Sequence, residues 1–233
     1  MLTRTIAKYA TALTIVASLF VQTATAAETA MTVRARDAWA HQQSKEALAA
    51  ANEAISLNPK DAEAYAIRGK VYFNYEQFDR ALSDFNTALR IQPGMQDPSV
   101  YQFRAECFIS KQDYPKAVSD LQRVIRVWPN PPSYRHLGQV YRQLNKLDEA
   151  VDCFSKSIAL DKKSFWTYKE RGDVYVLLKK YPNALSDYSK VIEIDPSSSM
   201  GYRARAQMYL KLGKKDLADI DLKKAQEIEK AFD

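Results

Sequence analysis

An alanine that recurs about every 34 residues constrains the fold of this chain more than any other feature. The steps between its copies are 34, 36, 33, 34 and 34 residues, and the copies are Ala47, Ala81, Ala117, Ala150, Ala184 and Ala218. Each copy follows a short polar turn and opens an apolar pattern with helical spacing. The two irregular steps coincide with turn-type segments at residues 93–99 and 129–133, where length can vary without disturbing helix packing. A fixed period of this length predicts a repeat architecture.

Other residue types recur in register with these alanines. Sixteen residues before five of them stands a tyrosine, and four residues after the tyrosine stands a glycine or an alanine. A proline follows most of the alanines by twelve residues, at Pro59, Pro93, Pro129 and Pro196. This pattern resembles the tetratricopeptide repeat (TPR) family over nearly all of the chain beyond residue 26. The resemblance implies an all-α fold, a right-handed TPR superhelix (α-solenoid) of helix-turn-helix repeats.

The register predicts where the repeats begin and end. We expect a degenerate N-terminal repeat at residues 27–61 and five full units at 62–95, 98–130, 131–164, 165–198 and 199–230. Each unit supplies two helices, in the fourth unit at about 166–178 and 182–194, and Gly172 and Ala184 let them pack closely. No unit can bury its apolar face alone, so neighbours must stack. Asp219 and Gln226 replace the apolar residues of earlier units in the last one, which predicts that the array ends there.

The first 26 residues differ from the rest and have the layout of a secretory signal peptide. Arg4 and Lys8 make a basic start, residues 9–21 are an apolar stretch, and residues 24–26 are the small residues Ala-Thr-Ala. The apolar stretch has 13 residues, against about 20 needed to cross a bilayer. An uncleaved anchor is the alternative. We therefore expect an exported chain starting near Ala27, periplasmic or extracellular if the source is bacterial, with no stable membrane insertion after cleavage.

The charge of the chain gives no support to a nucleic-acid partner. The formal net charge is +6, and it falls to +4 without Arg4 and Lys8, because residues 1–26 contain no acidic residue. Such a small value does not require a polyanionic partner, and export makes one less plausible. Nucleic-acid binding by helical repeats is therefore the least favoured of the function classes.

The chain also lacks the motifs of catalysis or metal binding. Its two histidines, His41 and His136, stand outside any metal-ligand spacing, Gly-rich phosphate loop or nucleophile motif. An exported protein could link Cys107 and Cys153, but two cysteines do not make a disulfide framework. The repeat register places them on different helices facing different neighbours, which favours two buried thiols. We predict a non-enzymatic chain with no cofactor and no metal.

Four of the repeats carry an arginine and an aspartate at fixed positions. The arginine stands three residues after the first tyrosine of the unit, and the aspartate follows sixteen residues later. The third unit has neither and carries Leu137 and Cys153 instead. This joint exception predicts structural ion pairs within each repeat, between Arg68 and Asp84, Arg104 and Asp120, Arg171 and Asp187, and Arg205 and Asp221. Unpaired surface charges are the alternative.

The resemblance also implies a concave groove lined by the first helices, of the kind that binds an extended peptide or a partner's helix. Transferred residue by residue, the groove positions in its last three units are mainly basic, which suits an acidic segment or a carboxylate. The alternative is a merely solvated face. The candidate partner-binding residues are Lys70, Phe103, Arg135, Gln139, Arg142, Trp166, Lys169, Asp173, Arg203 and Gln207.

The sequence therefore favours an exported, non-catalytic TPR scaffold or adaptor that binds a protein or peptide segment. The alternative is a structural assembly subunit that self-associates through its ends or its convex face.

Overall fold

The structure, a computed structural model, describes residue 27 and residues 29–231. The predicted signal peptide at residues 1–26 lies outside this part of the chain. The described residues form helices joined by short turns and contain no β-strand, as the repeat pattern predicts. None of their helices is both long enough and apolar enough to cross a membrane. The chain divides into two compact units, unit 1 up to Ser110 and unit 2 from Lys111 onward.

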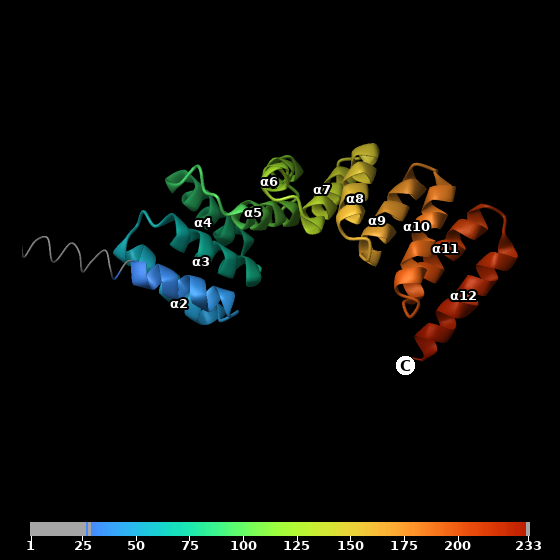
Figure 1. The fold of residues 1–233 in the computed structure, drawn as a ribbon, viewed down its shortest axis with the longest axis horizontal. Helices are drawn as coiled ribbons and strands as arrows, with labels where there is room; N and C mark the ends of the chain where they lie inside the picture. The colour runs from blue at the N-terminus through green and yellow to red at the C-terminus, as the bar shows by residue number, and fades with distance from the viewer. Residues whose placement is uncertain (1–26, 28, 232–233) are drawn as a thin grey trace, which may run out of the picture. The chain divides into compact units, whose positions relative to one another are not determined.

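Unit 1 contains five helices in its described part (Figure 1). Residues 29–40 form the first helix, and α2 (Ser44–Leu57), α3 (Ala62–Asn74), α4 (Phe78–Ile91) and α5 (Pro98–Ser110) follow. From α2 on, consecutive helices of this unit pack against each other. Small side chains of the first helix and α2, such as Ala35 and Ala47, share a core with Ile67 and Val71 of α3. The N-terminal hairpin is therefore a packed part of unit 1.

Unit 2 contains seven helices within residues 111–231. They are α6 (Tyr114–Val127), α7 (Pro131–Gln143), α8 (Leu147–Leu160), α9 (Phe165–Leu177), α10 (Tyr181–Ile194), α11 (Ser199–Lys211) and α12 (Lys215–Lys230). Each packs against the next, and α7 also contacts α9. Figure 1 shows the α8–α9 and α10–α11 connections at one end of the helices and the α9–α10 and α11–α12 turns at the other. The helices thus form antiparallel hairpins that stack on one another.

Glycine allows the two helices of a hairpin to approach closely. A Cβ atom built on Gly172 of α9 would lie 2.7 Å from Cε1 of Tyr188 on α10. In unit 1, a Cβ on Gly69 would lie 2.8 Å from the ring of Phe85. Carbon atoms do not approach this closely, so any side chain here would push the ring away. The recurring glycine is therefore a packing requirement.

The turn that follows the first helix of each repeat contains one residue with a left-handed backbone. The φ angles lie between 56° and 72°, at Gln42, Glu76, Gln112, Asn145, Lys179 and Gly213. This region is comfortable for glycine and costs other residues some free energy. Only the last of these turns uses glycine, so the others depend on the packing of the flanking helices.

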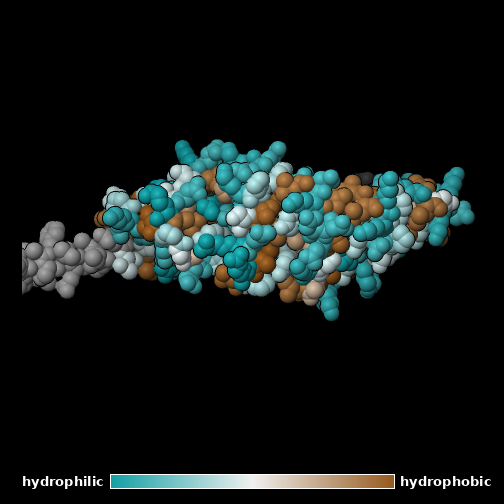
Figure 2. All heavy atoms as spheres, turned by 90° about the horizontal axis from the view of Figure 1, so that it is seen from above, coloured by the Kyte–Doolittle hydropathy of each residue, from teal (hydrophilic) through white to brown (hydrophobic). Residues whose placement is uncertain are grey.

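Hydrophobic side chains are also exposed on both units. Figure 2 shows hydrophobic patches between hydrophilic ones on the face that it draws. In unit 2, Val127 is 65% exposed, Ile220 63% and Leu177 58%. Isolated exposed apolar residues are normal on soluble proteins, so only those that gather in one place carry functional weight.

Candidate functional site

In three repeats the arginine lies against the aspartate of the same hairpin. Arg171 donates from Nε and Nη2 to the two carboxylate oxygens of Asp187, at 2.9 and 2.7 Å. The same two-bond geometry joins Arg68 to Asp84, at 2.7 and 2.8 Å, and Arg205 to Asp221, at 2.8 and 2.8 Å. The aspartates are buried. Such bidentate pairs fix the relative position of the two helices.

Two aromatic rings flank the guanidinium groups of Arg171 and Arg68, and one ring, Tyr209, lies beside that of Arg205. The Cζ atom of Arg171 lies 5.7 Å from the ring centroid of Tyr168 and 5.8 Å from that of Tyr175. Arg68 lies 5.3 Å from Tyr65 and 5.8 Å from Tyr72 in the same way. These distances are within cation–π range. The two repeated aromatic residues of the first helix thus form part of the arginine's site.

Each arginine also reaches the preceding hairpin, a contact that the sequence analysis missed. Nη1 of Arg171 donates to Ser155 Oγ on α8 at 2.9 Å, and Nη1 of Arg68 donates to Asn52 Oδ1 on α2 at 2.9 Å. The equivalent contacts are Arg205 to Ser189 at 3.2 Å and Arg104 to Asn86 at 2.9 Å. A polar residue recurs at the same repeat position in the hairpin before each arginine, and this recurrence could have predicted the contact. The guanidinium therefore connects neighbouring repeats as well as the helices of one repeat.

The third unit replaces this arrangement with apolar groups. Leu137 and Cys153 are each 5% exposed, and burial raises the pKa of the Cys153 thiol to about 12. Cys107 is likewise a buried free thiol. The remaining pair, Arg104 and Asp120, has one member in each unit and stays a prediction. The arginines are thus occupied by internal contacts, which gives them a structural role.

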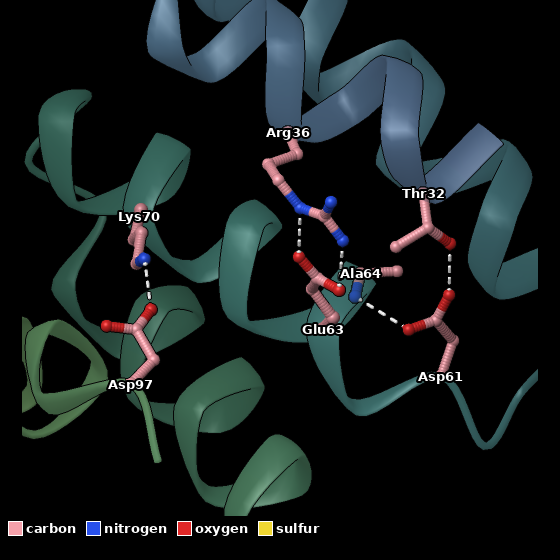
Figure 3. A network of polar contacts seen from close by, with 7 residues as sticks. All are labelled: Thr32, Arg36, Asp61, Glu63, Ala64, Lys70 and Asp97. Carbon is pink, nitrogen blue, oxygen red and sulfur yellow. Dashed lines mark hydrogen bonds and ion pairs between the residues drawn. The ribbon is translucent and has the colours of Figure 1, made fainter. Parts of the chain in front are cut away.

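The two groove candidates of unit 1 make internal contacts. Lys70 is buried, and its Nζ donates to Asp97 Oδ2 at 2.8 Å (Figure 3). Burial is the largest influence and would raise the pKa of Asp97, but the hydrogen bonds from Lys70 and Ser99 and the charge of Lys70 together lower the pKa. Phe103 packs edge to face on Trp39 and Phe73, with centroids 6.0 and 5.1 Å apart. Both side chains therefore make their contacts within unit 1.

A second polar network in unit 1 joins the first helix to the start of α3 (Figure 3). Arg36 donates to both carboxylate oxygens of Glu63, and Thr32 donates to Asp61 Oδ2. Asp61 Oδ1 accepts from the backbone N–H of Ala64 at 2.9 Å, which caps the N-terminus of α3. This network holds the N-terminal hairpin on the array.

In unit 2, Glu170 of α9 is the centre of the candidate groove. Gln139 of α7 donates from Nε2 to Glu170 Oε1, while the buried Oε2 has no hydrogen-bond partner among the described residues. Burial raises the pKa of Glu170, and the Gln139 hydrogen bond and the charges of Arg135 and Arg142 oppose the rise. These two arginines make no ion pair with the described residues. We call Arg135, Gln139, Arg142 and Glu170 the α7–α9 site.

The other candidates in unit 2 lie on α9 and α11. Lys169 pairs with Asp173 at 2.7 Å, and Tyr188 donates its hydroxyl to Asp173 Oδ1 at 2.9 Å. Arg203 makes a two-bond pair with Glu229 of α12. Gln207 is exposed and Trp166 is 50% exposed. Lys169 and Asp173 share helix α9 with Glu170, whereas Arg203 and Gln207 lie on α11.

The chemistry of this surface is that of recognition by charge and hydrogen bonding. Among the described residues there is no group of three or more His, Cys, Asp or Glu side chains that could hold a metal ion. Burial and the charge of Arg135 lower the pKa of His136 to about 4, so this imidazole is neutral at pH 7. The α7–α9 site combines two unpaired cations with a carboxylate oxygen that lacks a donor.

Family models match along much of the chain. One, described as TPR repeat, matches residues 138–179, and three described as tetratricopeptide repeat match residues 32–96, 165–198 and 202–232. No curated protein matches the chain.

Solved structures share the fold at low identity. MamA is 22% identical, with a TM-score of 0.66 over 70% of this chain and 95% of its own. YrrB, a TPR protein with an unusual peptide-binding site, is 21% identical, with a TM-score of 0.66 over 76% and 91%. PilF of Pseudomonas aeruginosa is 17% identical, with a TM-score of 0.67 over 85% and 90%. The repeat register, the helical hairpins and these matches lead to one conclusion: the chain belongs to the tetratricopeptide repeat family, and its fold is an all-α solenoid of these repeats.

Proposed function

We propose that the chain is an exported, non-catalytic scaffold that binds an acidic peptide segment of a partner protein at the α7–α9 site. The observation that carries the proposal is the pair Arg135 and Arg142, cations without an ion-pair partner among the described residues, beside the buried Oε2 of Glu170. A buried oxygen without a donor is costly, so this site gains free energy when a ligand supplies one.

An extended acidic peptide carries carboxylates for the two arginines and N–H donors for the carboxylate oxygen of Glu170. Its carboxylates can pair with the guanidinium groups, and movement of these side chains towards the peptide would open Glu170 Oε2, buried in the unbound chain, to a backbone N–H donor. Arg is well suited to carboxylate recognition because its planar fork makes two parallel hydrogen bonds. Trp166, Lys169, Asp173, Arg203 and Gln207 would extend the contact surface along α9 and α11.

The fold supports this proposal. Helical repeat arrays present extended surfaces suited to peptides, and YrrB, which shares the fold, has a peptide-binding site. The proposed export rests on the signal-peptide layout of residues 1–26. The N-terminal sequence of the protein recovered from its source tests export, and a start near Ala27 is expected.

Binding of short labelled peptides tests the proposed site. The chain starting at Ala27 would be titrated with Glu-rich, Gly/Ser and Lys-rich peptides, followed by fluorescence anisotropy. We expect binding of the Glu-rich peptide only, weakened about tenfold or more by Arg135→Glu with Arg142→Glu. The matched control is Lys214→Glu with Lys215→Glu, which makes the same change in net charge on exposed residues of the α11–α12 turn. Equal losses in both variants would refute the assignment of the site.

One observation favours self-association as a second function. The last helix, α12, carries Ile220 at 63% and Leu217 at 43% exposure, although Asp219 and Gln226 on the same helix are polar and exposed. Light scattering of the chain from Ala27 would report a concentration-dependent oligomer if α12 is an interface. Leu217→Ser with Ile220→Ser should then give a monomer, and a monomeric parent chain would exclude this function.

A further inference from the structure

The α6–α7 and α8–α9 connections lie next to each other on one edge of unit 2. Ser157, in the last turn of α8, donates its hydroxyl to the backbone oxygen of Pro131 at the start of α7, at 2.9 Å. The end of α8 is thereby held against the start of α7. Residues 126–129 and 160–166, which flank these two points in the chain, therefore belong to the same edge.

Large apolar side chains gather on this edge. Val127 is 65% exposed, Trp128 52%, Leu160 52% and Trp166 50%. The ring of Phe165 contacts that of Trp166 on one side, with centroids 4.7 Å apart and the ring planes tilted by 34°. An exposed group with two tryptophans in adjacent connections differs from the scattered apolar residues of an ordinary surface.

Basic side chains accompany the apolar ones. Arg126, Lys162 and Lys163 are exposed, and none makes an ion pair with another described residue. Asp161 is the one acidic residue in segments 126–133 and 160–166, and its Oδ1 accepts from the backbone N–H of Lys163 at 2.9 Å. The next connection, residues 195–198 with the sequence Asp-Pro-Ser-Ser, has neither aromatic nor basic residues. The combination is thus confined to two connections, and we call Arg126, Val127, Trp128, Leu160, Lys162, Lys163 and Trp166 the tryptophan edge.

We propose that the tryptophan edge binds the surface of an anionic phospholipid bilayer. Indole rings favour the boundary between headgroups and acyl chains, because one side of the ring is apolar and the N–H is polar. Lysine and arginine close to such a surface are attracted by its negative potential. A bilayer surface is broad enough to contact both connections at once. Its chemistry therefore matches the edge in apolar character and in charge.

The edge and the α7–α9 site make separable predictions. Arg135, Gln139, Arg142 and Glu170 are not part of the edge, whereas Trp166, in the first turn of α9, borders both surfaces. Membrane binding does not require peptide binding, and the variants Arg135→Glu and Arg142→Glu should leave it intact. The inference stands if the proposed function fails.

Vesicle binding of the chain starting at Ala27 tests the inference, since this chain keeps every described helix and lacks the apolar N-terminal stretch. The probes are vesicles of phosphatidylcholine alone and of phosphatidylcholine with phosphatidylglycerol, assayed by co-sedimentation. We expect binding to the anionic vesicles only, weakened by added salt. Lys162→Glu with Lys163→Glu should weaken binding by about 25-fold or more, since each basic residue contributes about fivefold.

Two further measurements decide the role of the apolar residues. In a Trp39→Phe background, tryptophan emission comes only from Trp128 and Trp166, and it should shift to the blue with anionic vesicles and be quenched by brominated lipid. Trp128→Ser with Trp166→Ser should reduce binding, and circular dichroism would verify that these exposed substitutions leave the helices intact. The control variant, Lys214→Glu with Lys215→Glu, should bind like the parent chain.

Three outcomes would overturn the inference. The first is absence of binding to anionic vesicles, and the second is an equal loss in the Lys214 and Lys215 control. The third is binding of soluble poly-glutamate that Lys162→Glu with Lys163→Glu abolishes, together with no blue shift on vesicles, which would assign the edge to an acidic polypeptide instead.

Discussion

Arg171 on α9 donates two hydrogen bonds to Asp187 on α10, while Tyr168 and Tyr175 flank its guanidinium group. The side chains of the pair are 19% and 4% exposed. Desolvation is the largest influence and alone would lower the pKa of Arg171, but the hydrogen bonds and the charge of Asp187 together raise the pKa. The pair is therefore a buried ion pair whose charges depend on each other.

Removing one member of this pair should be costly, and removing both should not. Arg171→Leu leaves the Asp187 carboxylate buried without its partner, and we expect a loss of about 3–5 kcal/mol in the free energy of unfolding. The double variant Arg171→Leu with Asp187→Cys copies Leu137 and Cys153 of the third unit, and we expect it to lie within about 1 kcal/mol of the parent chain. Urea unfolding measures all three. An Arg171→Leu variant as stable as the double variant would show that an unpaired Asp187 carries no cost.

Gly172 should tolerate no side chain. In Gly172→Ala the new Cβ would lie 2.7 Å from the Tyr188 ring, and the strain should cost about 1–3 kcal/mol of unfolding free energy. Gly94 is the matched control, because a Cβ there meets nothing within 4 Å. In thermal and urea unfolding, Gly172→Ala should be less stable than Gly94→Ala. Equal stabilities would contradict the packing argument.

Tyr188→Phe isolates one hydrogen bond. Phe85 and Phe154 occupy the equivalent positions against Gly69 and Gly138, so a phenylalanine ring fits the site. The variant loses only the hydroxyl donated to Asp173, and we expect a cost of about 1–2 kcal/mol. The chemical shift of the Asp173 carboxyl carbon should change as well. An unchanged stability and shift would mean that the hydrogen bond has no effect.

The stability of unit 2 should depend on the protonation of Glu170. Burial raises its folded-state pKa above the unfolded value, so its contribution to stability is present below the unfolded pKa and is lost as pH rises through the folded pKa. Glu170→Gln removes this loss. We expect the variant to be more stable than the parent chain at pH 7, with a difference that shrinks as the pH falls through the raised folded-state pKa of Glu170 towards its unfolded value of about 4.3.

Urea unfolding from pH 3 to 8 measures this difference, and the parent-minus-variant comparison cancels the contribution of Asp187, whose pKa burial also raises. A difference that is constant with pH would contradict the buried state of the carboxylate.

The sequence was a good guide to the fold because its packing requirements recur. The helices expected at about 166–178 and 182–194 lie at Phe165–Leu177 and Tyr181–Ile194. The close approach of the helices at Gly172 was predictable, because the repeat pattern itself shows a residue with no side chain at this position. The left-handed turn residues were not predictable, since Glu76 and Lys179 have no intrinsic preference for positive φ and adopt it because the packed helices impose it.

The candidate site was harder to predict from the sequence. The joint exception of Leu137 and Cys153 suggested the partner of each arginine, but the serine and asparagine contacts depend on how hairpins stack. The pairing of Lys70 with Asp97 arises in the segment between α4 and α5, where the repeat period is broken. The burial of Glu170 against Gln139 also depends on the packing of α9 near α7, because the two residues are 31 positions apart in the sequence.

The hydrogen bonds from Arg171 to Ser155 and from Arg205 to Ser189 join neighbouring repeats, and they affect how unit 2 unfolds locally. In a linear array, cooperativity depends on coupling between nearest neighbours. At the α6–α7 contact, Leu137 replaces the guanidinium, and Gln122 instead donates to the Tyr141 hydroxyl at 3.1 Å on the exposed surface. Helix α6 should therefore fray separately from α7–α12, and its amides should exchange with deuterium sooner than those of α8 and α10.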